Sequence, residues 1–305
     1  MKLNLPNTLI AASVVLFLAA CSGTPGGNGT DSVKPGDSLT VTGLNVKGHN
    51  FMMPSPMIVA DMIKKSGALY DKNMMNPVEN LSKYSDGMKQ SLNLGVYGAD
   101  LGYVTMYENT GDAMAYYKTV VQLGTSLKIT GSFDANLMKR FSDNVGKKDS
   151  ILQLVGEAYQ RSDKFLRDSQ QDDAAALILA GGWIESIYFA LNVYKQKPDE
   201  NVSVRIGEQK ATASGIVKVL TDLTKKEDGS PDDKKTAELG DLIKLFSDLS
   251  DSYQKVEIKY TFAEPTNDET NKITTINGKT EVKITPEQLA DLTAKVTAVR
   301  DYIIK

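Results

Sequence analysis

The sequence contains one cysteine and one histidine among 305 residues, and this scarcity argues against several kinds of chemistry. A single cysteine allows no internal disulfide bond. A Ser-His-Asp or Cys-His nucleophile system would have to use His49, and conventional zinc sites need several His or Cys ligands. His49 lies in Gly48-His49-Asn50, which we interpret as a solvated turn. We therefore expect no catalytic residue, no metal and no cofactor.

Phosphate-binding and calcium-binding loops are also missing from the sequence. Gly278-Lys279-Thr280 matches the end of a phosphate loop, but Ile273 stands where the leading glycine is required. The acidic stretch 227–233 lacks the alternating oxygen ligands of a calcium loop. Basic and acidic residues number 35 and 38, and no basic stripe with interleaved aromatics occurs. Nucleic acid is therefore not expected as a partner.

The N-terminal segment predicts export from the cytoplasm. Lys2 is followed by the apolar run TLIAASVVLFLAA at residues 8–20. This run is shorter than the roughly 20 residues that span a bilayer, but it fits the apolar region of a secretory signal. We expect residues 1–20 to be a signal peptide. No later segment is expected to be long and apolar enough to cross a membrane.

Leu18-Ala19-Ala20-Cys21 resembles the lipobox of bacterial lipoproteins, and Cys21 is the only cysteine of the chain. The resemblance implies cleavage before Cys21 and acylation of the new N-terminus, which anchors such proteins to a membrane. Residues 21–38, rich in Gly, Ser, Thr and Pro, are interpreted as a flexible tether. Since no charged cluster follows Cys21, we expect an outer-membrane protein that faces the periplasm.

Residues 39–305 are predicted to form an all-α domain, a bundle of about nine helices. Four pairs of a capping residue and proline indicate helix starts, because the cap accepts an orphan N–H and proline lacks one. At one pair, Gln288 completes a capping box. The four pairs are Ser55-Pro56, Asn76-Pro77, Ser230-Pro231 and Thr285-Pro286.

Three segments interrupt the helical pattern. Residues 39–50 suggest a short strand at Leu39–Thr42 followed by a loop, and Val202 to Ile206 alternates apolar and polar residues. Near the C-terminus, Asn277-Gly278 is a strong turn signal. Residues 256–262 fit either a strand or an extension of the preceding helix. We predict a β-hairpin or small flap at about 256–284.

Two predicted helices share an unusual composition, with glycines and one acid in an apolar surrounding. The segment LNLGVYGADLGYVTMY, residues 92–107, carries Asp100, and the segment LAGGWIESIY, residues 179–188, carries Glu185. Glycine inside a helix costs about 1 kcal/mol relative to alanine, so two such helices are expected to approach closely. The residues assigned to this seam are Asp100, Glu185, Trp183, Tyr97, Tyr103, Tyr188, Gly98, Gly102, Gly181 and Gly182.

Two interpretations of the seam remain open. In the first, Asp100, Glu185, Trp183 and the tyrosines line a polar pocket for a small molecule. In the second, the acids pair with a basic residue or with tyrosine hydroxyls and only fix the packing, as buried acids must. The second interpretation is the commoner case.

The segments LNLGVYGADLGYVTMYE, FDANLMKRF and LAGGWIESIY resemble uncharacterised helical lipoproteins of Bacteroidetes, over about residues 75–200. The resemblance implies no activity. We expect a membrane-anchored, non-enzymatic binding or interaction module with an envelope protein as partner. The alternatives are a periplasmic ligand-binding protein with its pocket between the glycine-rich helices, and a carboxylate-dependent hydrolase that uses Asp100 and Glu185 as acid and base.

Overall fold

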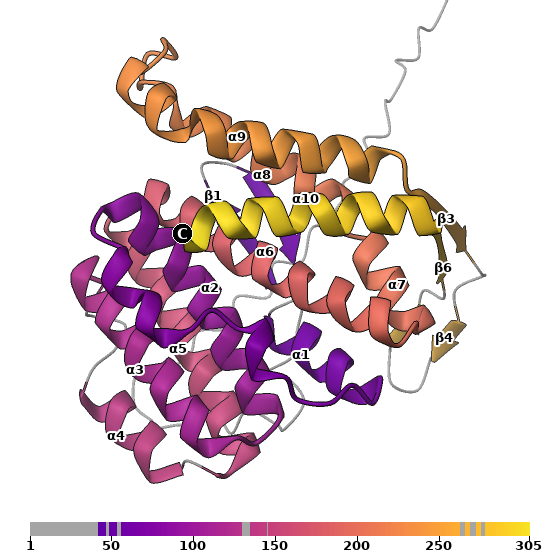
Figure 1. Ribbon diagram of the computed structural model, residues 1–305, viewed down its shortest axis with the longest axis horizontal. Helices are drawn as coiled ribbons and strands as arrows, with labels where there is room; N and C mark the ends of the chain where they lie inside the picture. The colour runs from indigo at the N-terminus through magenta and orange to yellow at the C-terminus, as the bar shows by residue number, and fades with distance from the viewer. Residues whose placement is uncertain are drawn as a thin grey trace, which may run out of the picture. The chain divides into compact units, whose positions relative to one another are not determined.

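The computed structural model describes residues 42–46, 49–53, 56–129, 135–144, 146–262, 266–268, 273–275 and 278–305. All of them belong to one compact unit, Pro35–Lys305. The protein is all-α with small antiparallel strand pairs, which confirms the predicted fold class (Figure 1). The signal segment, Cys21 and the tether lie outside the described residues.

The described part of the chain contains ten α-helices, two short 3-10 helices and six strands. The helices are α1 (Pro56–Lys65), η2 (Lys72–Met74), η3 (Val78–Lys83), α2 (Gly87–Met106), α3 (Thr110–Ser126), α4 (Ala135–Asn144), α5 (Lys148–Asp168), α6 (Asp172–Gln196), α7 (Glu200–Gly207), α8 (Lys210–Leu223), α9 (Asp233–Gln254) and α10 (Pro286–Ile304). The strands are β1 (Thr42–Val46), β2 (His49–Met53), β3 (Glu257–Phe262), β4 (Thr266–Asp268), β5 (Ile273–Thr275) and β6 (Gly278–Lys283).

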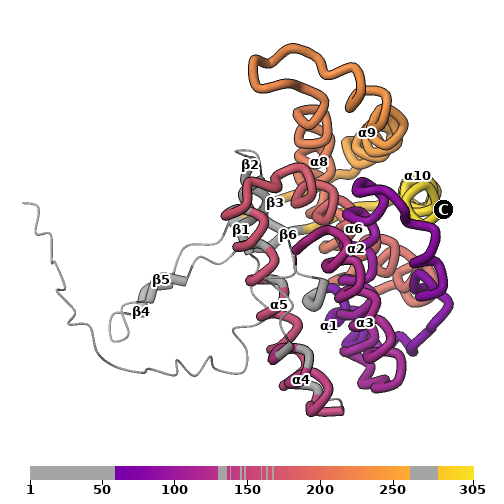
Figure 2. The backbone as a smooth tube through the Cα atoms, turned by 90° about the vertical axis from the view of Figure 1, so that its left-hand side faces the viewer, coloured from indigo at the N-terminus to yellow at the C-terminus, as the bar shows by residue number. Residues whose placement is uncertain are grey.

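Helices α2 and α6 form the centre of the bundle and lie side by side (Figures 1 and 2). Every residue of α2 from Ser91 to Met106 is buried, as expected of a helix that other elements cover on all sides. By length and composition alone, α6 would qualify as a membrane-spanning helix, contrary to our expectation from the sequence. Most of its side chains are instead buried against the rest of the protein, and α10 packs on it.

Close contact between the two backbones explains the glycines of this seam. A Cβ at Gly95 would lie 2.0 Å from the carbonyl oxygen of Ile178, and one at Gly181 would lie 1.9 Å from that of Leu92. Gly182 packs against Gly95 from the opposite helix. No larger residue fits at Gly95 or Gly181 unless the helices separate.

The helix starts follow the predicted cap chemistry at some positions and depart from it at others. Helix α1 begins at Pro56, and α10 begins with the predicted capping box of Thr285 and Gln288. The prediction at Ser230 was wrong, because α9 begins at Asp233 and the side chain of Asp232 accepts the N–H of Lys235. The Asn76 prediction was also wrong, since the following turn is the 3-10 helix η3, with Pro77 at its N-cap.

Residues 202–206, which alternate apolar and polar, lie in helix α7 rather than in a strand. The side chain of Asp199 caps this helix by accepting the N–H groups of Asn201 and Val202. Val202 and Ile206 are four residues apart, so both face the core from one side of the helix, and both are fully buried. Over five residues, periods of 2 and 3.6 cannot be distinguished.

Helix α9 ends at Gln254, and residues 257–262 form strand β3 rather than an extension of that helix. Strand β3 pairs with β6 in an antiparallel ribbon in which Phe262 lies opposite Gly278. Gly278 is therefore a strand residue rather than part of a tight turn, and Asn277 lies outside the described residues.

His49 was likewise wrongly assigned to a turn, since it pairs with Val46 in the β1–β2 ladder.

The seam glycines lead to a direct test by substitution with alanine. Gly95→Ala and Gly181→Ala are each expected to destabilise the protein by more than about 3 kcal/mol, because the new methyl group would overlap main-chain atoms. Urea unfolding, followed through the fluorescence of the single tryptophan, measures this loss.

Gly240→Ala is the matched control. Gly240 lies in helix α9 with nothing within 4 Å of an added Cβ, so alanine should raise stability by about 0.5–1 kcal/mol. Equal effects at positions 95 and 240 would contradict the close approach of α2 and α6.

Candidate functional site

The seam contains a buried ion pair between Glu185 on α6 and Arg300 on α10. The Nε and NH2 groups of Arg300 donate to the two carboxylate oxygens of Glu185 at 2.6 Å and 2.7 Å. The same NH2 group also donates to the carbonyl oxygen of Met74 at 2.9 Å. The guanidinium lies 4.1 Å from the ring centre of Tyr188, a cation–π contact. Arg300 therefore connects α6, α10 and the chain around η2.

Asp100 on α2 is the second acid of the seam. Asp100 and Glu185 are both 0% exposed. One carboxylate oxygen of Asp100, Oδ2, accepts the backbone N–H of Asn76 at 3.2 Å. Burial raises the pKa of Asp100 well above its ordinary value, and the adjacent Glu185 raises it further, whereas Arg300 lowers it. Burial also raises the pKa of Glu185, although Arg300 acts in the opposite direction.

Asn76 organises the polar groups next to the acids. Its side-chain amide donates to the hydroxyl of Tyr84 and to the side-chain oxygen of Asn93, and its carbonyl oxygen accepts the hydroxyl of Tyr116. Asn93 in turn donates to the carbonyl of Ile303. These bonds satisfy buried polar groups from α2, α3, α10 and the chain before η3. The network therefore fixes the positions of these elements.

The structure places the predicted tyrosines around the seam in three different roles. Tyr97 donates its hydroxyl to the carbonyl of Pro77 at 2.8 Å. Tyr103 stacks on Phe189, with ring centres 4.7 Å apart, and its hydroxyl accepts the N–H of Asp71. Tyr188 covers the guanidinium of Arg300. All three tyrosines make these contacts with other parts of the protein.

Trp183 does not join the two acids, contrary to the pocket interpretation. Its indole N–H donates to the side-chain oxygen of Gln209 at 3.0 Å. Its ring lies near Phe246 and Tyr253 of α9, with centres 6.2 Å away in each case. Trp183 therefore packs α6 against α9 and the start of α8. Residues 183 and 185 are two positions apart in one helix, so they do not share a face.

The predicted glycines also divide into two groups. Gly181 and Gly182 lie at the close approach of the helices, together with Gly95 on α2. Gly98 and Gly102 are buried on α2. The seam thus combines close backbone contact with a buried ion pair, and this geometry matches the packing interpretation of Asp100 and Glu185.

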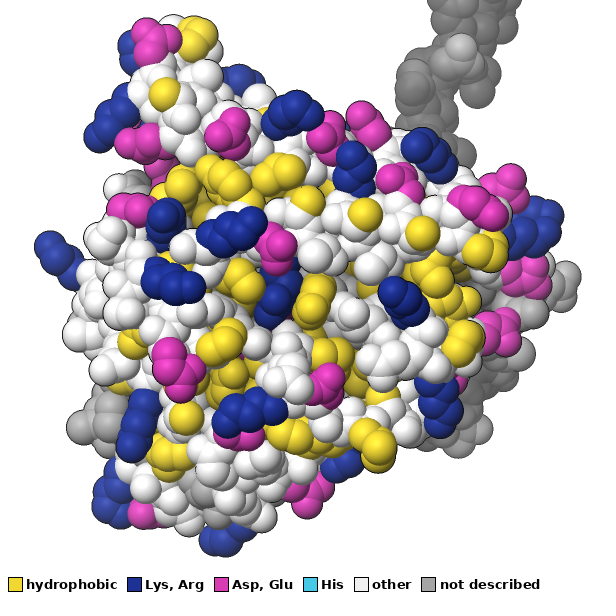
Figure 3. Space-filling view, in the orientation of Figure 1, with side chains coloured by type: hydrophobic (Ala, Val, Ile, Leu, Met, Phe, Trp, Pro, Cys, Tyr) yellow, Lys and Arg dark blue, Asp and Glu magenta, His cyan; other side chains and the backbone are white. Residues whose placement is uncertain are grey.

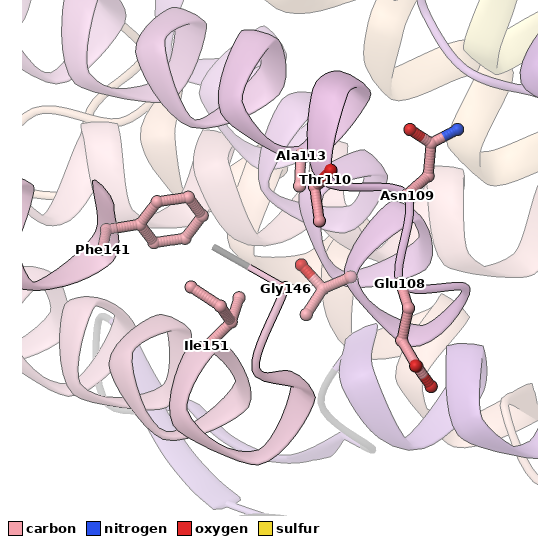
Figure 4. A pocket seen from close by; sticks show the side chains of 8 residues that line it. Glu108, Asn109, Thr110, Ala113, Phe141, Gly146 and Ile151 are labelled. Carbon is pink, nitrogen blue, oxygen red and sulfur yellow. The ribbon is translucent and has the colours of Figure 1, made fainter. Parts of the chain in front are cut away.

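Two surface hollows of the described chain lie away from the acids. The first is small, about 20 Å³, with room for roughly one water molecule. Phe141 and Ile151 face Thr110 and Ala113 across it, while the carboxylate of Glu108 points away (Figure 4). The second hollow, of about 410 Å³, lies beside β3 and is lined by Glu208, Lys210, Ala211, Ser214, Gln254, Ile258 and Tyr260.

Among the described residues, no group of three or more His, Cys, Asp or Glu side chains is placed to hold a metal ion.

Sequence reasoning missed Arg300 and Asn76. The signal for Arg300 was its place in α10, where Leu292, Val296, Val299 and Ile303 define the buried face and Arg300 falls within it. A basic residue on an apolar face predicts a buried acid as its partner. Asn76 offered no comparable signal, because an asparagine before proline is typical of an exposed turn.

Comparison with protein-family models finds no match for this sequence, and comparisons with curated proteins and with solved structures find none either. The resemblance to helical lipoproteins of Bacteroidetes therefore stays a prediction.

The ion pair predicts a large effect of removing its basic partner. Arg300→Met leaves Glu185 buried without its counter-charge, which should lower the free energy of unfolding by about 3–5 kcal/mol at pH 7. The loss should shrink as the pH falls towards 5, because Glu185 can then take up a proton. Thermal or urea unfolding at both pH values measures the effect.

Two variants serve as controls for this loss. The double variant Glu185→Leu/Arg300→Met removes both charges and should regain most of the stability. Lys164→Met breaks an exposed pair with Asp168, whose side chains are 73% and 64% accessible, and should leave the unfolding midpoint almost unchanged. A similar loss in Arg300→Met and Lys164→Met would contradict the role of the buried pair.

Proposed function

We propose that this chain is a bacterial envelope lipoprotein, anchored through acyl chains on Cys21, whose helical domain acts as a non-enzymatic binding or interaction module. The observation that carries the proposal is the order of a basic start, an apolar run and Leu18-Ala19-Ala20-Cys21. The only cysteine of the chain falls on the one position that lipidation requires. The outer membrane, with the domain facing the periplasm, is the proposed location.

The geometry of the seam supports an interaction module over the two alternatives. A ligand-binding site or a hydrolase centred on Asp100 and Glu185 needs carboxylates that a substrate can reach. Both acids are fully buried, and Arg300 occupies both oxygens of Glu185. Backbone contact at Gly95 and Gly181 leaves no room for a ligand where the two helices meet. These residues are better suited to holding the bundle together.

The surface beside β3 fits contact with a partner. Tyr260 is 60% exposed, and only one other large hydrophobic side chain of the described residues, Leu69, is comparably open. Tyr260 borders the 410 Å³ hollow, whose lining combines the apolar Ile258 with polar side chains. On the face in Figure 3, basic and acidic side chains are interspersed rather than gathered by sign. A partner that binds through an exposed aromatic residue agrees with both observations.

Lipid labelling tests the anchor. In a bacterium with two membranes, the wild-type protein should incorporate a clickable palmitate analogue and sediment with the outer membrane. Cys21→Ser should lose the label and become soluble in the periplasm. Protease added to intact cells should leave the wild-type protein uncut, since the domain is proposed to face the periplasm. A labelled Cys21→Ser variant, or a soluble wild-type protein, would refute the anchor.

Site-specific photocrosslinking tests the interaction module. A photoreactive phenylalanine analogue at position 260 should give a discrete higher-mass adduct in cells that produce the anchored protein. The same analogue at Lys234, a highly exposed position at the start of α9, is the matched control and should give none. Equal adducts at both positions, or none at position 260, would count against partner binding beside β3.

A further inference from the structure

The charges of the seam do not balance if both acids are ionised. Asp100 and Glu185 are fully buried, and one guanidinium, that of Arg300, is the cation that reaches them among the described residues. Two carboxylates and one guanidinium leave a net charge of −1 in a site without solvent. An isolated buried charge is so costly that such groups become neutral instead.

The hydrogen bonds show that Asp100, and not Glu185, has a carboxylate oxygen without a hydrogen-bond partner among the described residues. Each oxygen of Glu185 accepts an N–H from Arg300, and Oδ2 of Asp100 accepts the N–H of Asn76. Oδ1 of Asp100 is buried, and no donor from the described residues reaches it. An ionised Asp100 would therefore bury an acceptor without a partner. A proton on Oδ1 turns that atom into a donor, and the carboxyl group of Glu185, which interacts with the Asp100 side chain, can act as the acceptor.

We propose that the α2–α6–α10 seam is a proton-binding site. In this site the carboxyl group of Asp100 stays protonated at neutral pH and donates a hydrogen bond to the carboxylate of Glu185. Arg300 then balances the single remaining carboxylate. The proton belongs to Asp100 because the two bonds from Arg300 hold Glu185 in its charged form. With this one proton the site becomes electrically neutral, and each buried oxygen of the two acids gains a partner.

The groups that face Asp100 from the surrounding elements agree with this assignment. They are Glu185 on α6, Arg300 on α10, Tyr116 on α3, Tyr84 after η3 and Tyr97 on α2 itself. The pKa values of the three tyrosines are all raised, chiefly by burial, so these rings stay neutral across the physiological range. Of the group, only the two acids can change charge between pH 4 and pH 8, and the pKa of Asp100 is well above normal.

The proton couples folding to pH. In the unfolded chain Asp100 has an ordinary carboxyl pKa near 3.9 and is ionised above about pH 5. The folded state retains the proton, so unfolding at neutral pH releases one. The contribution of the site to stability is complete below pH 4 and is lost as the pH rises towards the folded-state pKa of Asp100. In that window each rise of one pH unit increases the equilibrium constant for unfolding about tenfold, which corresponds to about 1.36 kcal/mol.

The variant Asp100→Asn isolates this contribution. Asparagine has the same shape, its oxygen can accept the N–H of Asn76, and its NH2 group can donate to Glu185 without a titratable proton. The unfolding constants of the wild type and of Asp100→Asn are measured in urea from pH 5 to pH 8. Their ratio should rise about tenfold per pH unit from pH 5 until the folded-state pKa of Asp100 is reached. The ratio cancels the opposite trend of partly exposed acids such as Asp248, whose pKa is lowered by Lys244.

A flat ratio over the whole range would overturn the proposal. Asp168→Asn, at an exposed carboxylate, is the matched control and should give a nearly flat ratio over the same range. Infrared spectroscopy provides a second readout that does not depend on a folded variant. At pH 7 the wild-type protein should show the C=O stretch of a protonated carboxyl group, which moves when aspartate is labelled with ¹³C. Absence of this band, or a band whose frequency does not change when aspartate is labelled, would also overturn the proposal.

Discussion

The guanidinium of Arg300 is the group on which the rest of the bundle depends. It binds Glu185 of the central helix α6, the carbonyl of Met74 and the face of Tyr188, so a single side chain joins three separate parts of the chain. The hydrogen bonds of Asn76 and Asn93 extend the connection to α2 and α3. Replacing this arginine by an apolar residue of similar size would leave the acid of Glu185 buried without its partner. In contrast, one apolar core side chain can often be exchanged for another of similar volume at little cost in stability.

Close packing and buried charge reinforce one another in this seam. The glycines bring the backbones of α2 and α6 into contact, which excludes water from the two acids. Exclusion of water strengthens the bond between Glu185 and Arg300 and, by the same physics, makes an unpartnered charge on Asp100 costly. For a protein proposed to be tethered to a membrane by a flexible segment, a core fixed in this way leaves contacts with partners to the surface. There Tyr260 is the most exposed aromatic ring among the residues that the structure describes.

The sequence predicted the helical fold because its signals are local. The capping box of α10 and the start of α1 at Pro56 depend on residues a few positions apart. The close approach at Gly181 could also be anticipated, since two helices shared the same costly composition. The apolar face of α10 marked Arg300 as a residue that needs a buried acid, but no local rule says which one, because Glu185 lies 115 residues earlier in the chain. Trp183 was misplaced for a related reason: proximity in sequence to Glu185 does not decide which helix face it occupies.

The distance along the chain between these partners has a kinetic meaning. A chain that is made, or crosses a membrane, from its N-terminus carries Glu185 for 115 residues before its counter-charge arrives, and Met74 for 226. Contacts of such separation form slowly, because a long loop must close before they stabilise the fold. Until α10 docks, Glu185 lacks the guanidinium that offsets the cost of burying its charge. Late closure of this kind would suit the exported lipoprotein proposed above, which would cross a membrane before it folds.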